Sequence, residues 1–182
     1  MGRFHALDAV VEGKAMEDLS LQRDLDELAR TLVKVASVRG YTIATAESCT
    51  AGLVASSIAG VPGASSVLRG GAVTYCDEVK HNVLGVSREV LETFTAVSEP
   101  CACEMAEGAR SLFDADLAVS LTGYAGPGGG TEVDPTGTVY IGMSNRGVTH
   151  CVRCSFEGDR NEVRARAVLF ALTELINCCS HM

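Results

Sequence analysis

A serine between a predicted strand and a predicted helix is the first residue in this chain that could do chemistry. Residues 45–52 read TAESCTAG, with Ser48 at the junction. Backbone N–H groups at the start of a helix lack partners and favour negative charge, so a serine there can cap the helix or act as a nucleophile. The segment is not a G-x-S-x-G elbow, because Ala46 and Thr50 occupy the glycine positions. Both interpretations of Ser48 stay open at this point.

Two further segments carry groups that a serine nucleophile would need. Residues 69–80 (RGGAVTYCDEVK) place Tyr75 at the end of a predicted strand and Lys80 about one turn into a predicted helix. Lys80 is either a solvated helix residue or a base, which must be neutral to take the proton of a hydroxyl. Residues 122–131 (TGYAGPGGGT) expose backbone N–H groups after a buried strand, which suits a phosphate or a carboxylate. No Gly-Lys-Ser/Thr follows, so the loop is not a P-loop.

Alternating strands and helices must position these segments. Hydrophobic spacing predicts strands at residues 41–46, 67–75, 117–121, 137–143 and 147–156. It predicts helices at residues 21–38, 48–59, 76–84 and 98–113, a short helix capped by Ser87, and a final helix to residue 176 that starts at a capping box of Asp159 and Glu162. This order predicts a single three-layer α/β/α domain with a mixed β-sheet, with ligands at strand ends. Residues 1–20 are expected to form a loose N-terminal arm.

Composition excludes several other classes of protein. The chain of 182 residues has 15 Lys and Arg against 23 Asp and Glu, and its net charge of −8 makes it a poor non-specific nucleic-acid binder. No apolar stretch approaches about 18 residues without a charge, Gly or Pro, and the start of the chain lacks the layout of a signal peptide. We therefore expect a cytoplasmic protein that binds neither nucleic acid nor membranes.

The eight cysteines are expected to be reduced thiols, because nothing in the sequence points to an oxidising compartment. Cys151 and Cys154 form a C-x-x-C pair, but on a strand they point to opposite faces, which is poor geometry for one zinc ion. Redox or metal chemistry remains the alternative for these thiols. The four histidines are scattered, with no H-E-x-x-H motif, so neither a metal nor a cofactor is expected.

Six blocks of sequence occur in an order that resembles the C-terminal domain of the CinA family, the nicotinamide-nucleotide amidases. They are TAESCTAGL, RGGAVTYCDEVKHNVLGV, AVSEPCACEMAEGAR, LTGYAGPGGG, PTGTVYIG and FEGDRNEVR. The resemblance covers roughly residues 25–176, within an expected domain of residues 21–182, and the chain resembles the stand-alone form of that domain. It implies hydrolysis of nicotinamide mononucleotide to nicotinate mononucleotide and ammonia in the recycling of pyridine nucleotides. It also implies a small mononucleotide as substrate, no cofactor, and a homo-oligomer.

The resemblance also implies roles for individual residues. Ser48 matches the nucleophile, Lys80 its base, and Tyr75 an assisting tyrosine. Arg160 matches an arginine that we assign to the substrate phosphate. The remaining positions expected to bind substrate are Thr45, Glu47, Cys49, Thr50, Arg69, Thr122, Gly123 and Gly126. A nearby cation such as Arg69 or Arg160 would favour a neutral lysine, and backbone donors in the first turn after Ser48 would hold the oxyanion.

Four positions depart from the family pattern. Ala51 replaces the usual second glycine of C-T-G-G, and Cys76 and Asp77 stand where the family more often has Ser-Asn. Tyr124 is bulkier than the usual residue after T-G. Because Ala51 and Tyr124 are expected close to the pocket, the substrate could be another amide that carries a phosphate. A catalytically silent nucleotide-binding or interaction module is the other alternative.

Overall fold

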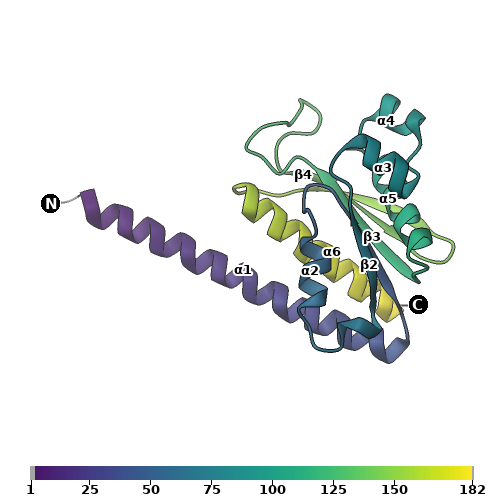
Figure 1. Ribbon diagram of the computed structural model, residues 1–182. Helices are drawn as coiled ribbons and strands as arrows, with labels where there is room; N and C mark the ends of the chain where they lie inside the picture. The colour runs from purple at the N-terminus through teal and green to yellow at the C-terminus, as the bar shows by residue number, and fades with distance from the viewer. Residues whose placement is uncertain (1–2, 182) are drawn as a thin grey trace.

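A mixed sheet of five strands forms the centre of the molecule (Figure 1). The computed structural model describes residues 3–181. In spatial order the strands are β2 (Leu68–Val73), β1 (Ile43–Glu47), β3 (Leu117–Gly123), β4 (Thr138–Ser144) and β5 (Thr149–Ser155). β1 is parallel to both of its neighbours, and β4 is antiparallel to β3 and β5. The carboxyl ends of β1, β2 and β3 therefore meet at one edge, where ligands gather in folds of this kind.

Helices cover both faces of this sheet. On one face α1 (Arg3–Arg39), α2 (Leu53–Ala59) and α6 (Arg160–His181) enclose a core that includes Leu32, Ile58 and Leu172. On the other face α3 (Asp77–Leu84), α4 (Arg88–Phe94) and α5 (Glu99–Leu112) enclose a second core, which includes Ala44 of β1 and Met105 of α5. A short 3-10 turn, Ala64–Ser66, leads into β2. The prediction of a three-layer α/β/α domain with a mixed sheet is confirmed.

Three helix starts that the sequence indicates are confirmed. Ser87 Oγ and Ser98 Oγ each accept a hydrogen bond from the backbone N–H three residues further on, at 3.2 and 3.3 Å. Asp159 and Glu162 cap α6 reciprocally, because each side chain accepts from the backbone N–H of the other. Such caps satisfy backbone donors that have no partner within the helix.

The first helix begins much earlier than the spacing predicts. α1 starts at Arg3 rather than near Leu21, so the segment expected as a loose arm is helical. Hydrophobic periodicity detects a helix by its buried face, and residues 17–20 are exposed, so the pattern fails there. Within this stretch Glu17 pairs with Arg166 at 2.9 Å and Lys14 pairs with Asp159, both next to or within α6. The division of the chain into an arm of residues 1–20 and a domain of residues 21–182 stays a prediction.

The second helix begins later than predicted. α2 starts at Leu53 rather than at Ser48, and its N-cap residue is Gly52, with φ of 94°. Ala51 just before it has φ of 52°, also in the left-handed region. Residues 48–52 therefore form a turn between β1 and α2, and Ser48 does not cap the helix.

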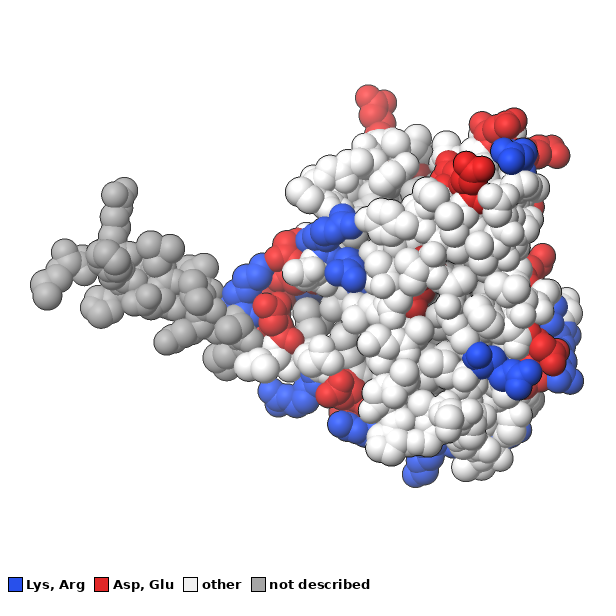
Figure 2. Space-filling view, in the orientation of Figure 1, with Lys and Arg blue, Asp and Glu red and all other residues white. Residues whose placement is uncertain are grey.

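Charge on the face seen in Figure 2 is mixed rather than segregated. Figure 2 shows acidic and basic side chains interspersed around the rim of one face, with a largely uncharged centre. Within residues 3–181 no helix is both long and apolar enough to cross a membrane. Among the residues whose side chains the structure describes, no group of His, Cys, Asp and Glu could hold a metal ion. Cys151 and Cys154 lie on opposite faces of β5, as expected: Cys154 packs with the core beneath α6, and Cys151 lies near Cys103 of α5.

Candidate active site

A cavity of about 230 Å³ lies at the carboxyl ends of β1 and β3. Its walls come from the turn after β1, the start of α3, the loops before α5 and after β3, and the start of α6. Among the predicted site residues, those that line it are Ser48, Cys49, Tyr75, Lys80, Thr122, Gly123, Gly126 and Arg160. The fold thus brings together segments that are more than a hundred residues apart in the chain.

The end of β1 orients Ser48 toward α3. Alternation along the strand directs Ala44 and Ala46 into the core under α5, and Ser48 continues on that face. The Ser48 N–H donates to Leu121 O at 2.9 Å, which prolongs the pairing of β1 with β3. The next two backbone N–H groups, of Cys49 and Thr50, donate to no oxygen among residues 3–181. Both instead contact the Cys49 thiol, a weak acceptor that a developing oxyanion beside Ser48 would have to displace.

Lys80 is the buried partner of this serine. Only 1 % of its surface is exposed, which is rare for a lysine. Its Nζ donates to Ser48 Oγ at 3.3 Å and to the Thr74 carbonyl at 3.0 Å. No carboxylate in the described part of the chain forms an ion pair with Lys80. The amine is thus fixed on the serine hydroxyl rather than held as half of a salt bridge.

The thiol next to Ser48 is unsuited to serve as the nucleophile. Cys49 lines the cavity but is only 6 % exposed. Burial raises the pKa of this thiol from its ordinary 9.0 to about 11. Because the thiolate is the nucleophilic form of cysteine, Cys49 is inert near neutral pH. Ser48 is the hydroxyl that the lysine contacts.

Arg160 links two other segments that line the cavity, at Tyr75 and at Gly126. It is the first residue of α6, and its guanidinium donates to the Tyr75 hydroxyl at 2.8 Å and to the Gly126 carbonyl at 2.6 Å. Tyr75 itself is 59 % exposed, so this contact holds the ring at the mouth of the cavity. An arginine fork suits a phosphate or carboxylate, and here it stands beside a glycine-rich loop.

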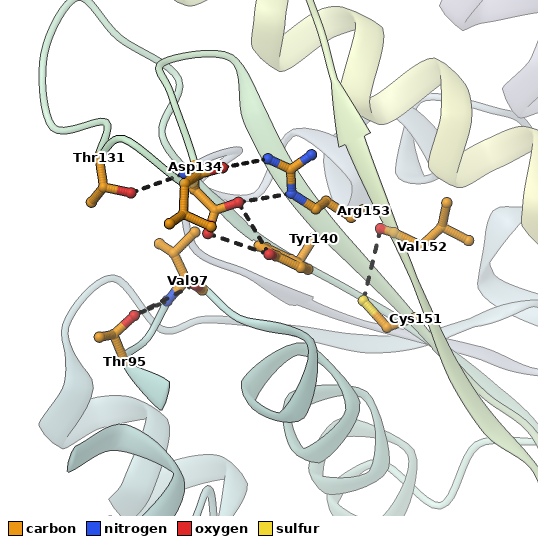
Figure 3. A network of polar contacts seen from close by, with 9 residues as sticks. Thr95, Val97, Thr131, Asp134, Tyr140, Cys151, Val152 and Arg153 are labelled. Carbon is orange, nitrogen blue, oxygen red and sulfur yellow. Dashed lines mark hydrogen bonds and ion pairs between the residues drawn. The ribbon is translucent and has the colours of Figure 1, made fainter. Parts of the chain in front are cut away.

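The glycine-rich loop after β3 is anchored at its distal end. Figure 3 shows Asp134 between Arg153 of β5 and Tyr140 of β4. Its carboxylate accepts from Arg153 Nε at 2.8 Å and from the Tyr140 hydroxyl at 3.1 Å. Thr131 Oγ1 also accepts from the Asp134 N–H at 2.9 Å. With Arg160 bonded to Gly126, the loop is held at both ends of its span over the cavity.

Four of the predicted residues lie outside the cavity lining. Thr45 and Glu47 point to the opposite face of β1, under α2. The Glu47 carboxylate is fully buried and accepts from the backbone N–H groups of Gly52, Val54 and Ala55 at 2.9–3.1 Å. It therefore caps α2, the task that the sequence suggested for Ser48. Thr45 is also fully buried, against Gly71 of β2.

The other two are Thr50 and Arg69. Thr50 is fully buried in the turn, and its carbonyl accepts from Arg164 at 2.9 Å. Arg69 lies near the amino end of β2, whereas the cavity lies at the carboxyl ends of the strands. There it donates to Phe113 O at 3.3 Å and pairs with Asp114 at 3.6 Å. Arg69 is thus too far along the strand to act on Lys80, contrary to the expectation from the sequence.

Tyr124 lines the cavity, as expected, whereas Ala51 does not. Five further lining residues were not predicted: Asp77, Ala96, Val97, Ala125 and Gly128. Asp77 could have been found from its spacing, since residues three apart share a helix face and Lys80 is three positions further on. Ala96 and Val97 carry no local signal. They are brought to the cavity by Thr122, whose hydroxyl donates to the Ala96 carbonyl at 2.6 Å. Thr122 thus lines the cavity itself and also positions the segment of Ala96 and Val97.

Fold and site together define an α/β protein in which a half-buried serine meets a buried lysine at the carboxyl edge of a mixed sheet. The family model of the CinA C-terminal domain matches residues 25–179, and the chain belongs to this family. Two crystal structures agree with that membership. A CinA superfamily protein from Klebsiella pneumoniae has a TM-score of 0.84 at 39 % identity, covering 87 % of this chain and 99 % of that one. A competence/damage-inducible protein from Agrobacterium tumefaciens has a TM-score of 0.82 at 40 % identity, covering 85 % and 94 %.

Curated relatives are longer than this chain. A "CinA-like protein" of Thermotoga neapolitana is 42 % identical over 150 residues, which are 82 % of this chain and 36 % of the relative. A "Putative competence-damage inducible protein" of Caldanaerobacter subterraneus is 45 % identical over 148 residues, with 81 % and 36 % covered. The chain therefore spans about a third of the length of these relatives.

Proposed function

We propose that this chain is an amidase that hydrolyses nicotinamide mononucleotide to nicotinate mononucleotide and ammonia. The observation that carries the proposal is the 3.3 Å contact between Lys80 Nζ and Ser48 Oγ inside the cavity. This distance is slightly longer than the reach of about 2.6–3.2 Å for proton transfer between a nucleophile and its base, and such contacts tighten when substrate binds. Membership of the CinA family supports the assignment of substrate.

In the first half-reaction the Lys80 amine, acting as the base, takes the proton of Ser48 as the hydroxyl oxygen attacks the carboxamide carbon. The new C–O bond leaves a tetrahedral oxyanion, which we assign to the N–H groups of Cys49 and Thr50 in place of the Cys49 thiol that they contact here. Lys80 then returns the proton to the amide nitrogen, the C–N bond breaks, and ammonia leaves. The Thr74 carbonyl fixes Nζ throughout, since it accepts from Lys80 at 3.0 Å.

In the second half-reaction water hydrolyses the ester on Ser48. Lys80 accepts a proton from the water as its oxygen attacks the acyl carbon, and gives it to the Ser48 oxygen as the ester bond breaks. The carboxylate product then leaves and both residues are restored. Lys80 returns each proton that it takes, and the carboxylic acid formed gives its own proton to ammonia as it becomes the carboxylate, so the reaction uses one water and consumes no other reagent.

The phosphate of the substrate is assigned to Arg160. Its guanidinium lines the same cavity as Lys80 and already donates to two neutral oxygens, Tyr75 Oη and Gly126 O. A phosphate offers charged oxygens, and hydrogen bonds between ions are stronger than those to neutral oxygens. A guanidinium has five N–H donors, so we expect the phosphate to bind the remaining ones while Tyr75 stays bonded to Arg160.

The test is ammonia release from nicotinamide mononucleotide by wild type, Ser48→Ala and Lys80→Met. We expect each variant to lose about 10³-fold or more in rate, because each removes one member of the proton-transfer pair. Ser56→Ala is the matched control, since Ser56 is exposed on α2 and outside the cavity. It should retain the wild-type rate.

Other outcomes would overturn parts of the proposal. Release by wild type and Ser48→Ala alike would remove Ser48 from its role. Silence from a folded wild type on this nucleotide, with release from another phosphorylated amide, would change the substrate. Silence on all such amides, with measurable binding, would indicate a nucleotide-binding module.

A further inference from the structure

Two residues that line the cavity have no role in the chemistry described above. They are Tyr124, which follows β3, and Asp77, the first residue of α3. We infer that Tyr124 and Asp77 select an amide carried on a planar, positively charged aromatic ring. The inference rests on the proposed amidase and adds the residues that recognise the ring.

The backbone holds the Tyr124 side chain in a defined place. Its N–H donates to Thr138 O at 2.9 Å, and its carbonyl accepts from Gly137 N–H at 2.7 Å. The ring lies against Gly129, where an added Cβ would stand 3.4 Å from Tyr124 Cδ1. Its hydroxyl makes no hydrogen bond with any residue of the described range 3–181. The half-buried ring is thus a fixed aromatic wall of the cavity that no other polar group engages.

The second aromatic residue of the lining is already in use. The Tyr75 hydroxyl is bonded to Arg160, at the end of the cavity assigned to the phosphate. Tyr124 is therefore the aromatic side chain left for the ring of the substrate. An aromatic face attracts a cation placed above it, and a planar ring can lie flat on such a face.

Asp77 supplies a negative charge in the same cavity. It lies three residues before Lys80, so both side chains project from the same side of α3. Within residues 3–181 its carboxylate takes part in no hydrogen bond or ion pair, whereas Arg160 and Lys80 are both engaged. A carboxylate without a partner beside an aromatic wall favours a cationic group over a neutral one.

The ring of nicotinamide mononucleotide is a pyridinium cation, and its reduced dihydropyridine form is neutral and not aromatic. Both forms carry the same carboxamide, ribose and phosphate. Comparing the two nucleotides therefore isolates the contribution of the ring to binding from that of the rest of the substrate. The ratio of their dissociation constants measures how strongly the cavity prefers a charged, planar ring.

The experiment uses calorimetric titration of both nucleotides into Ser48→Ala, so that binding is read without turnover. We expect the oxidised form to bind more tightly. Adding Tyr124→Leu should reduce this preference about fivefold, while Tyr124→Phe, which keeps the aromatic face, should preserve it. Adding Asp77→Asn should reduce it about twofold to fivefold, because the exposed charge is screened.

Glu78→Gln is the control for Asp77, since it removes one negative charge at the next position of α3 but lies outside this cavity. It should leave the preference unchanged. The inference would be overturned if Tyr124→Leu and Asp77→Asn weakened the binding of both nucleotides equally. It would also be overturned if Glu78→Gln reduced the preference as much as Asp77→Asn does. Selective binding with no ammonia release by wild type would overturn only the amidase. Binding of neither nucleotide would overturn both.

Discussion

At the scale of single residues, Glu47 shows how a buried carboxylate can be mistaken for a ligand of the substrate. It stands next to Ser48 in the sequence, yet strand alternation turns it to the other face of the sheet. Its two oxygens receive three backbone N–H groups at the start of α2. This carboxylate also meets the positive end of the helix dipole. We therefore assign Glu47 to the stability of the turn that carries Ser48.

Replacing Glu47 by Gln tests that assignment. Glutamine has the size of glutamate but no charge. Its NH2 group is a hydrogen-bond donor, and here it would face backbone N–H groups, which are donors as well. We expect the free energy of unfolding in urea to fall by about 1–3 kcal/mol. A matched change at exposed Glu78, also Glu→Gln, should have little effect. An unchanged stability for Glu47→Gln would contradict the capping role.

At the scale of elements, the turn between β1 and α2 carries a residue in an unfavourable conformation. Ala51 has φ of 52°, in the left-handed region that costs a non-glycine residue about 1 kcal/mol or more. Ala51→Gly removes that strain but makes the unfolded chain more flexible, which offsets part of the gain. We expect a net increase of about 0.5–1 kcal/mol in the free energy of unfolding. A decrease in the same urea titration would show that the turn does not strain Ala51.

The glycine-rich loop gives a second prediction at this scale. Asp134 anchors its distal end, so Asp134→Ala should free residues 124–137 to move. We expect amide hydrogen exchange in this loop to accelerate. The KM for nicotinamide mononucleotide should rise several-fold more than kcat falls, because the loop contributes to binding rather than proton transfer. Glu132→Ala, an exposed change on the same loop, is the control and should leave exchange and KM as in wild type.

At the scale of the whole molecule, buried thiols couple stability to pH. Burial raises the pKa of Cys49 to about 11 and that of Cys101 to about 12, above the ordinary 9.0. When pH exceeds about 9, these thiols ionise in the unfolded chain but stay protonated in the folded one. The unfolded state then binds fewer protons, so stability is full below that pH and is lost as pH rises.

We therefore expect the midpoint of urea unfolding to fall between pH 8.5 and about 10.5. Changing Cys49 and Cys101 together to Ala should weaken that dependence without abolishing it, because burial also raises the pKa of Cys151 to about 12 and that of Cys179 to about 11. Cavity formation lowers stability at every pH. In native protein at pH 8, a thiol reagent should modify exposed Cys76 quickly and these two slowly. Rapid modification of all three would contradict the burial on which the prediction depends. The oligomeric state stays a prediction, to be measured by light scattering.

Much of the candidate site was predictable because its residues lie at the ends of elements with clear boundaries. Ser48, Tyr75 and Lys80 flank strands whose parallel direction brings their carboxyl ends together. Arg69 was not placed correctly, although strand geometry could have excluded it. It precedes Tyr75 by six positions in the sequence, which at about 3.3 Å per residue separates the two by roughly 20 Å along an extended chain.

The sequence by itself determined the order of strands and helices, the caps at Ser87, Ser98 and Asp159, and the residue types available for catalysis. These features depend on neighbours within a few positions, so local spacing reveals them. Only the tertiary structure decided that Glu47 caps α2, that Lys80 reaches Ser48, and that Tyr124 and Asp77 share a cavity. Those outcomes depend on which strands pair and which face each helix covers, and long-range packing sets both.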